Sequence, residues 1–107
     1  MREADVLDAF CRYLYAHGWT TTTSAREVDV YATRGPERLY AEAKGTTAAT
    51  GLDVDTAYGQ LLRRMGEDDP GDPAPLYVLV VPAHAERAAL RVASRIRQLL
   101  GIKVFVA

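Results

Sequence analysis

Two stretches of alternating apolar and polar residues, 27–33 and 38–44, stand on either side of Gly35-Pro36. A period of two residues predicts β-strands, because successive side chains of a strand point to opposite faces of a sheet. A Gly-Pro pair between two such stretches predicts the turn of an antiparallel hairpin. One face is expected to carry Val28, Val30, Ala32, Leu39, Ala41 and Ala43, and the other Asp29, Tyr31, Thr33, Tyr40, Glu42 and Lys44.

The rest of the chain supplies helices and further strands for this sheet. Apolar residues that recur every three or four positions predict helices, and runs of β-branched residues predict strands. The expected helices span 3–17, 55–65 and 85–100, and the expected further strands span 19–23, 76–81 and 102–106. The run 76–81 is continuously apolar, which predicts a strand covered on both faces at the sheet centre. The small polar residues of 46–51 predict a loop, and 66–75 predict a solvated connection.

The element order is therefore α-β-β-β-α-β-α-β. Consecutive strands followed by strands that alternate with helices predict an α/β fold, a mixed β-sheet flanked by helices. The 107 residues suffice for one domain, 1–107, and two separate cores would each be too small to fold unaided. A hydrophobic content of 49% with 25% charged residues excludes a chain that is disordered throughout.

Composition also narrows the compartment and the partners. The longest apolar run is far shorter than the roughly 20 residues of a membrane-spanning helix, and the acidic start of the chain does not resemble a secretory signal. Cys11 is the single cysteine, so no internal disulfide or thiolate cluster can form, and we expect a cytoplasmic protein. The net charge is −1, so contact with nucleic acid requires a local basic patch.

Three polar residues of the hairpin are expected on one face: Asp29, Glu42 and Lys44. If the turn pairs Arg34 with Glu37, Asp29 lies opposite Glu42, with Cβ atoms about 4.5–5.5 Å apart. A longer turn that pairs Arg34 with Leu39 instead places Asp29 opposite Lys44, and both registers keep the three side chains together. Two carboxylates this close repel, which raises the pKa of one of them or requires a bound cation, and Mg²⁺ suits such a site. A neighbouring ammonium can orient or deprotonate water and counter charge on a phosphate.

These residues lie within three segments, Val28-Asp29-Val30, Glu42-Ala43-Lys44-Gly45 and Tyr58-Gly59-Gln60-Leu61-Leu62. Together they resemble the PD-(D/E)XK nuclease superfamily, a restriction endonuclease-like group that includes Holliday-junction resolvases and Mrr-type enzymes. The resemblance covers roughly residues 3–81, with Val28 where the proline that names the motif would stand.

The resemblance implies a role for each residue. Asp29 and Glu42 would hold Mg²⁺, for which Mn²⁺ is an expected substitute, and Lys44 would activate water. Gln60 is similar to a glutamine that many members carry near the metal. An acid of the first helix often assists; Glu3 is preferred here over Asp5 and Asp8.

The leading hypothesis is thus a Mg²⁺-dependent endonuclease that hydrolyses DNA phosphodiester bonds. Basic residues expected to contact phosphates are Arg63, Arg64, Arg87 and Arg91. Arg87, Arg91 and Arg95 are expected to form one stripe on the last helix. The last strand could pair with a second copy as a homodimer, and neither a membrane nor a small organic cofactor is expected.

Alternatives remain open at this stage. The three hairpin residues could form a solvated face, Gln60 could make an ordinary polar contact, and an acid such as Glu3 is favoured in a first helical turn by the helix dipole alone. A catalytically inactive nuclease-like domain that binds nucleic acid or regulates is the alternative function. A small-molecule binding protein is less supported, because no glycine-rich phosphate loop is present.

Overall fold

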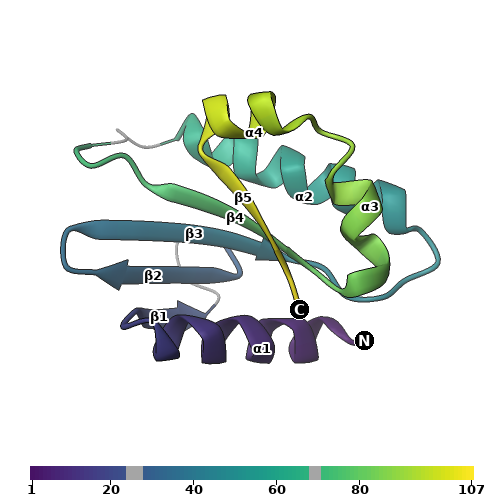
Figure 1. Cartoon of the computed structure of the whole chain (residues 1–107), viewed down its shortest axis with the longest axis horizontal. Helices are drawn as coiled ribbons and strands as arrows, with labels where there is room; N and C mark the ends of the chain where they lie inside the picture. Colours follow the sequence, from purple (N-terminus) through teal and green to yellow (C-terminus); the bar gives the residue numbers. More distant parts are fainter. Residues whose placement is uncertain (24–27, 68–70) are drawn as a thin grey trace.

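The computed structural model describes residues 1–23, 28–67 and 71–107. Its centre is a five-stranded sheet in the order β1-β2-β3-β4-β5 (Figure 1). The strands are β1 (Thr20–Thr23), β2 (Val30–Arg34), β3 (Glu37–Ala43), β4 (Leu76–Val81) and β5 (Ile102–Val106). β1, β2 and β3 pair antiparallel, whereas β3, β4 and β5 pair parallel. The sheet is mixed, as the order of elements predicted.

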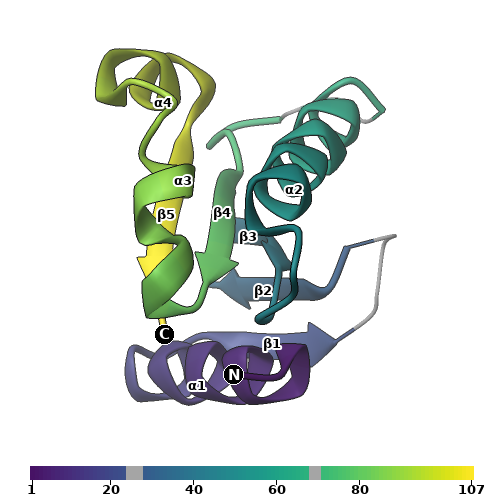
Figure 2. The same ribbon diagram turned by 90° about the vertical axis from the view of Figure 1, so that its right-hand side faces the viewer.

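Helices cover both faces of the sheet. They are α1 (Glu3–Ala16), α2 (Thr50–Met65), α3 (Glu86–Ala89) and α4 (Ser94–Leu100), with a 3₁₀ turn η1 (Ala83–Ala85) before α3. Helix α1 lies below the sheet, and α2, α3 and α4 lie on its other side (Figure 2). This arrangement confirms the expected fold class, and the element order agrees once the last helix is counted as one region. No helix in the described part of the chain is both long and apolar enough to cross a bilayer.

Each face of the sheet has its own apolar core. The α1-side core contains Val6, Phe10, Leu14, Trp19, Val30, Ala32, Leu39, Ala41, Ala43, Val78 and Val80. The α2-side core contains Val28, Tyr40, Val54, Ala57, Tyr58, Leu61, Tyr77, Leu79, Val81, Ala85, Ala89 and Ile102. Strand β4 contributes to both cores, which explains its continuous apolar run. It lies beside the central strand, β3, rather than at the centre itself.

The hairpin has the first of the two registers considered from the sequence. Arg34 pairs with Glu37, and Val30 pairs with Ala41. Gly35 has a φ of 59°, a conformation that glycine adopts without strain. The turn residues therefore determine which side chains of β2 and β3 face one another.

The start of the first hairpin strand differs from the prediction. β2 begins at Val30, because the chain bends at Asp29. Val28 consequently packs in the α2-side core while Val30 packs in the α1-side core, so the expectation that they share a face is wrong. The predicted strand began at Glu27, which lies outside the described residues. β1 begins at Thr20, one residue later than expected.

The expected helix 85–100 is interrupted. It is divided into η1, α3 and α4, with Leu90 to Ala93 between α3 and α4. The hydroxyl of Tyr58 donates to the carbonyl of Ala89, and Arg97 Nε donates to the carbonyl of Val92 at 3.0 Å. Side chains thus bond two of the carbonyls that lie at the break.

Helix α2 begins at Thr50, five residues before the predicted start at 55. The first turn includes Thr50 and Gly51, for which the small polar composition of 46–51 predicts a loop. Residues just before the helix support this start: the Thr47 hydroxyl donates to Asp53 and accepts a bond from the Ala49 N–H. Local hydrogen bonds therefore begin the helix without a large apolar residue.

Candidate functional site

The candidate site lies where β3 ends. On the pleat of β3, Glu42 points to the same side as Tyr40, a member of the α2-side core. Only 4% of Glu42 is exposed, and it is the one charged residue that is buried among those described. Lys44 follows the strand, and its N–H donates to Val80 O at 3.0 Å, which ties it to β4. The parallel pairing of β3 with β4 therefore fixes the backbone around both residues.

Asp29 is held opposite this strand end by a local departure from the hairpin ladder. Its N–H donates to Ala41 O at 3.1 Å, one residue off the register of the pairs in β2 and β3. Its Oδ2 accepts a hydrogen bond of 2.8 Å from the N–H of Ala43. A side-chain oxygen thus replaces a backbone acceptor, and the carboxylate is held beside Glu42.

The electrostatics of Glu42 show which groups surround it. Its pKa is raised to about 8, first by burial and then by the negative charge of Asp29 and a hydrogen bond with it. The charge of Glu3 raises the pKa further, and the ammonium of Lys44 lowers it. At neutral pH the Glu42 carboxyl therefore keeps its proton, which relieves repulsion between the two acids. The structure brings together four residues that the sequence singled out.

Glu3 reaches this group because the start of α1 packs on the chain that follows β3. A Cβ on Gly45 would lie 2.4 Å from the backbone nitrogen of Glu3, so only glycine fits there. The N–H of Thr46 donates to Met1 O at 2.7 Å, and the amino group of Met1 donates to Thr46 Oγ1 at 2.6 Å. This role of Gly45 was not predicted, and the one sign of it in the sequence is a glycine directly after Glu42-Ala43-Lys44.

Gln60 lies on α2 beside a polar cavity of about 160 Å³ that Arg63, Arg64 and Glu67 also line. Its Oε1 is buried and has no hydrogen-bond partner among the described residues. Buried acceptors of this kind are uncommon, so the atom can accept a bond from water or a ligand. Among the described residues, Asp29, Lys44 and Glu3 act on the pKa of Glu42, and Gln60 is not one of these groups.

The two arginines of α2 differ in what they can reach. Arg64 is 10% exposed at its side chain, pairs with Glu67 at 3.2 Å and lies over the ring of Tyr40 at 4.9 Å. Arg63 is exposed. Of the two, Arg63 is the side chain open to a phosphate.

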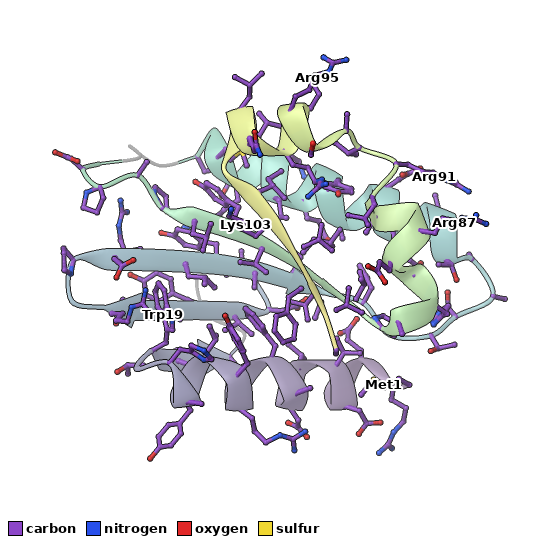
Figure 3. All side chains as sticks on the ribbon, viewed as in Figure 1. Met1, Trp19, Arg87, Arg91, Arg95 and Lys103 are labelled. Carbon is purple, nitrogen blue, oxygen red and sulfur yellow. The ribbon has the colours of Figure 1, made fainter. Side chains whose placement is uncertain are left out.

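Arg87 and Arg91 line a shallow hollow of about 510 Å³ together with His84 and Leu90. Both arginines project from the end of the molecule at which Met1 lies (Figure 3). Arg95 stands on α4, separated from them by the break in the helix. The expected stripe of three arginines on one continuous helix is therefore wrong, but the pair Arg87 and Arg91 remains together.

The donor set suits a magnesium ion better than a transition metal. In residues 1–23, 28–67 and 71–107, no three or more His, Cys, Asp or Glu side chains form a complete metal-binding group. Asp29 and Glu42 supply two carboxylates, and Mg²⁺ commonly takes one or two carboxylates together with water and phosphate oxygens. Two carboxyl groups held this close can both ionise when a cation lies between them.

The fold and site define an open, mixed α/β sheet with an acid pair and a lysine at the end of one strand. The fold is shared with a crystal structure of an XisH family protein from Nostoc punctiforme PCC 73102. The TM-score is 0.58 and the sequences are 20% identical, over 87% of this chain and 82% of that chain. No family model matches this chain. A search of curated proteins likewise found no match.

Proposed function

We propose that this chain is a Mg²⁺-dependent endonuclease that hydrolyses phosphodiester bonds of DNA. The observation that carries the proposal is the group at the end of β3: Glu42 is buried next to Asp29, and Lys44 and Glu3 act on its pKa. A buried acid beside a second carboxylate is costly for a fold, so its presence favours a functional role. The resemblance to PD-(D/E)XK nucleases assigns that role to these same residues.

In this proposal Asp29 and Glu42 would hold the ion, for which Glu42 would have to be ionised. The ion would supply Lewis-acid chemistry to the phosphodiester and to water. Lys44 orients the attacking water and stabilises the negative charge that develops on the phosphate. One phosphorus–oxygen bond forms from water, another breaks, and the leaving oxygen takes a proton.

The basic residues have a separate part in the proposal. Arg87 and Arg91 are exposed on the end of the molecule that also carries Met1 (Figure 3). The chain that follows β3 lies near Met1, because the N–H of Thr46 donates to Met1 O. Together with Arg63, these two arginines would bind the phosphate backbone in a salt-dependent manner. Gln60 would donate or accept a hydrogen bond near the ion. The protein would act in the cytoplasm, where Cys11 stays reduced.

The test is cleavage of plasmid DNA by the purified chain with Mg²⁺ or Mn²⁺. Removing an ion ligand or the lysine should lower cleavage by at least about 10²-fold, the contribution typical of such groups. We therefore expect Glu42→Ala and Lys44→Ala to be inactive while their circular dichroism stays native. Glu37→Ala is the matched control, because Glu37 is an exposed glutamate at the other end of the same strand.

The second candidate is a nuclease-like module that binds nucleic acid without cutting it. It is favoured by one observation: the raised pKa of Glu42 keeps its carboxyl protonated at neutral pH, so the fold accommodates the acid pair without a cation. Binding of DNA without cleavage under any divalent ion would support this module and refute the endonuclease. Loss of cleavage in the Glu37→Ala control alone would also refute the assigned site.

A further inference from the structure

Strand β5 is an edge of the sheet, because it pairs only with β4 among the described strands. The N–H of Tyr77 donates to Gly101 O at 3.1 Å, and the N–H of Ala107 donates to Val81 O at 2.9 Å. Backbone groups alternate in direction along a strand, so Ile102, Val104 and Val106 direct theirs to the open side. Such a row of backbone groups is a template for another strand.

We propose that a second copy of this chain pairs its β5 with this edge, antiparallel and two-fold symmetric, with Val104 of each copy on the axis. Two five-stranded sheets would then join into one. The inference rests on the sheet edge and is independent of the proposed nuclease activity.

The faces of β5 limit the registers that a symmetric pair can adopt. Residues opposed in an antiparallel pair point to the same side of the sheet. Ile102 and Val104 contact the α2-side core, and Phe105 contacts the α1-side core. A two-fold axis must therefore pass through a residue of β5 rather than between two residues, since otherwise opposed side chains would point to different sides.

The charge of Lys103 and the number of paired residues distinguish the remaining positions of the two-fold axis. An axis through Lys103 places the two lysines directly opposite each other, which is destabilising. An axis through Phe105 pairs only three residues of each strand. An axis through Val104 pairs all five residues and places Lys103 opposite the other copy's Phe105, where an ammonium can lie against an aromatic ring.

Exposed apolar side chains flank this edge where the proposed partner would lie. Val106 at the end of β5 is 36% exposed. Helix α4 lies beside the start of β5 in both views (Figures 1 and 2), and its Leu99 and Leu100 are 83% and 37% exposed. Because the strands are antiparallel, Val106 of one copy would lie opposite Ile102 and next to α4 of the other copy. The exposed apolar residues at the two ends of the edge are thus complementary to each other.

The other face of the edge offers a further contact. A hollow of about 330 Å³ lies along β5 on the α1 side, and its walls include Phe10, Tyr13 and Phe105. Tyr13 is 43% exposed, and its ring lies 4.8 Å from that of Phe105. A five-residue ladder alone is small against the roughly 800 Å² a side of a stable interface. Contacts on both faces would extend it.

Cysteine cross-linking tests the register directly, in a Cys11→Ser background. Val104→Cys should give a covalent dimer under mild oxidation, because residues facing each other on the axis have Cα atoms about 5.5 Å apart, within disulfide range. Lys103→Cys should cross-link poorly, since two such residues would be about 8 Å apart. Thr22→Cys, an exposed position on the opposite edge strand, is the control and should form no covalent dimer.

Mass measurement tests the association without any cross-link. Sedimentation of the unmodified chain should show a species of twice 11.7 kDa. Val106→Lys should raise the dimer dissociation constant at least about tenfold by placing a charge against an apolar strand, and Thr22→Lys should not. A monomer at the highest soluble concentration would overturn the proposal. Cross-linking through Lys103→Cys or Thr22→Cys in preference to Val104→Cys would overturn it too.

Discussion

At the scale of single residues, the candidate site consists of one buried acid whose surroundings resist its ionisation. Burial removes water from Glu42, and Asp29 adds a negative charge beside it. Lys44 opposes these effects without cancelling them, so the pKa of Glu42 stays raised. The folded chain therefore holds a proton that the unfolded chain would release at neutral pH, and stability and pH are linked.

The first prediction concerns this linkage. The pKa of Glu42 is about 8 in the fold against an ordinary 4.5, so the free energy of unfolding should fall as pH rises from 4.5 to 8. At about 1.4 kcal/mol for each pKa unit, the loss is on the order of a few kcal/mol. Glu42→Gln removes this titration and should be more stable than the unmodified chain at pH 8. Urea unfolding of both proteins at several pH values measures the difference. If the free energy of unfolding changed equally with pH in both proteins, the raised pKa of Glu42 would be contradicted.

The second prediction concerns Gly45. Gly45→Ala places a methyl group against the backbone nitrogen of Glu3, so the start of α1 must move. Overpacking of this kind should cost roughly 1–3 kcal/mol of stability and should move Glu3 away from Glu42. Gly51→Ala is the matched control, because nothing lies within 4 Å of a Cβ there and Gly51 is helical. It should be neutral or slightly stabilising in thermal unfolding; equal losses in both variants would refute the close packing.

At the scale of elements, the sequence predicted those features that depend on residues adjacent in the chain. Gly35-Pro36 determined the hairpin turn, and the turn determined the register from Arg34–Glu37 to Val30–Ala41. Asp29 lies before this ladder and is held beside Glu42 by its own bonds to Ala41 O and to the N–H of Ala43. The break after Ala89 could not be predicted, because the three- and four-residue spacing of 85–100 is satisfied by a continuous helix. The hydroxyl that bonds Ala89 comes from Tyr58, 31 positions away, and such a partner is visible only in the fold.

This bond gives a third prediction. Tyr58→Phe leaves the Ala89 carbonyl buried without its donor, which should cost about 1–2 kcal/mol. Tyr15→Phe is the control, because Tyr15 is 84% exposed and its loss of a hydroxyl should change stability by less than about 0.5 kcal/mol. Chemical denaturation of both variants measures the costs. Equal stabilities would show that the hydroxyl does not hold α3 to α2.

At the scale of the whole molecule, the candidate site and the proposed dimer edge use different parts of one sheet. The site lies where β3 ends, next to the start of α1, and the edge is the outer side of β5. Strand β4 separates them and carries apolar residues on both faces. Variants at Val106 should therefore alter association and leave the proposed DNA cleavage unchanged.

The contact between Met1 and Thr46 has a practical consequence for anyone producing this protein. A purification tag fused ahead of Met1 would turn its amine into an amide and place foreign residues beside the carboxylates. A tag appended after Ala107 would leave that amine intact. Assays with the two tagged forms are therefore not interchangeable. If a preparation with a leading tag shows no cleavage, the assay should be repeated after the tag is removed up to Met1.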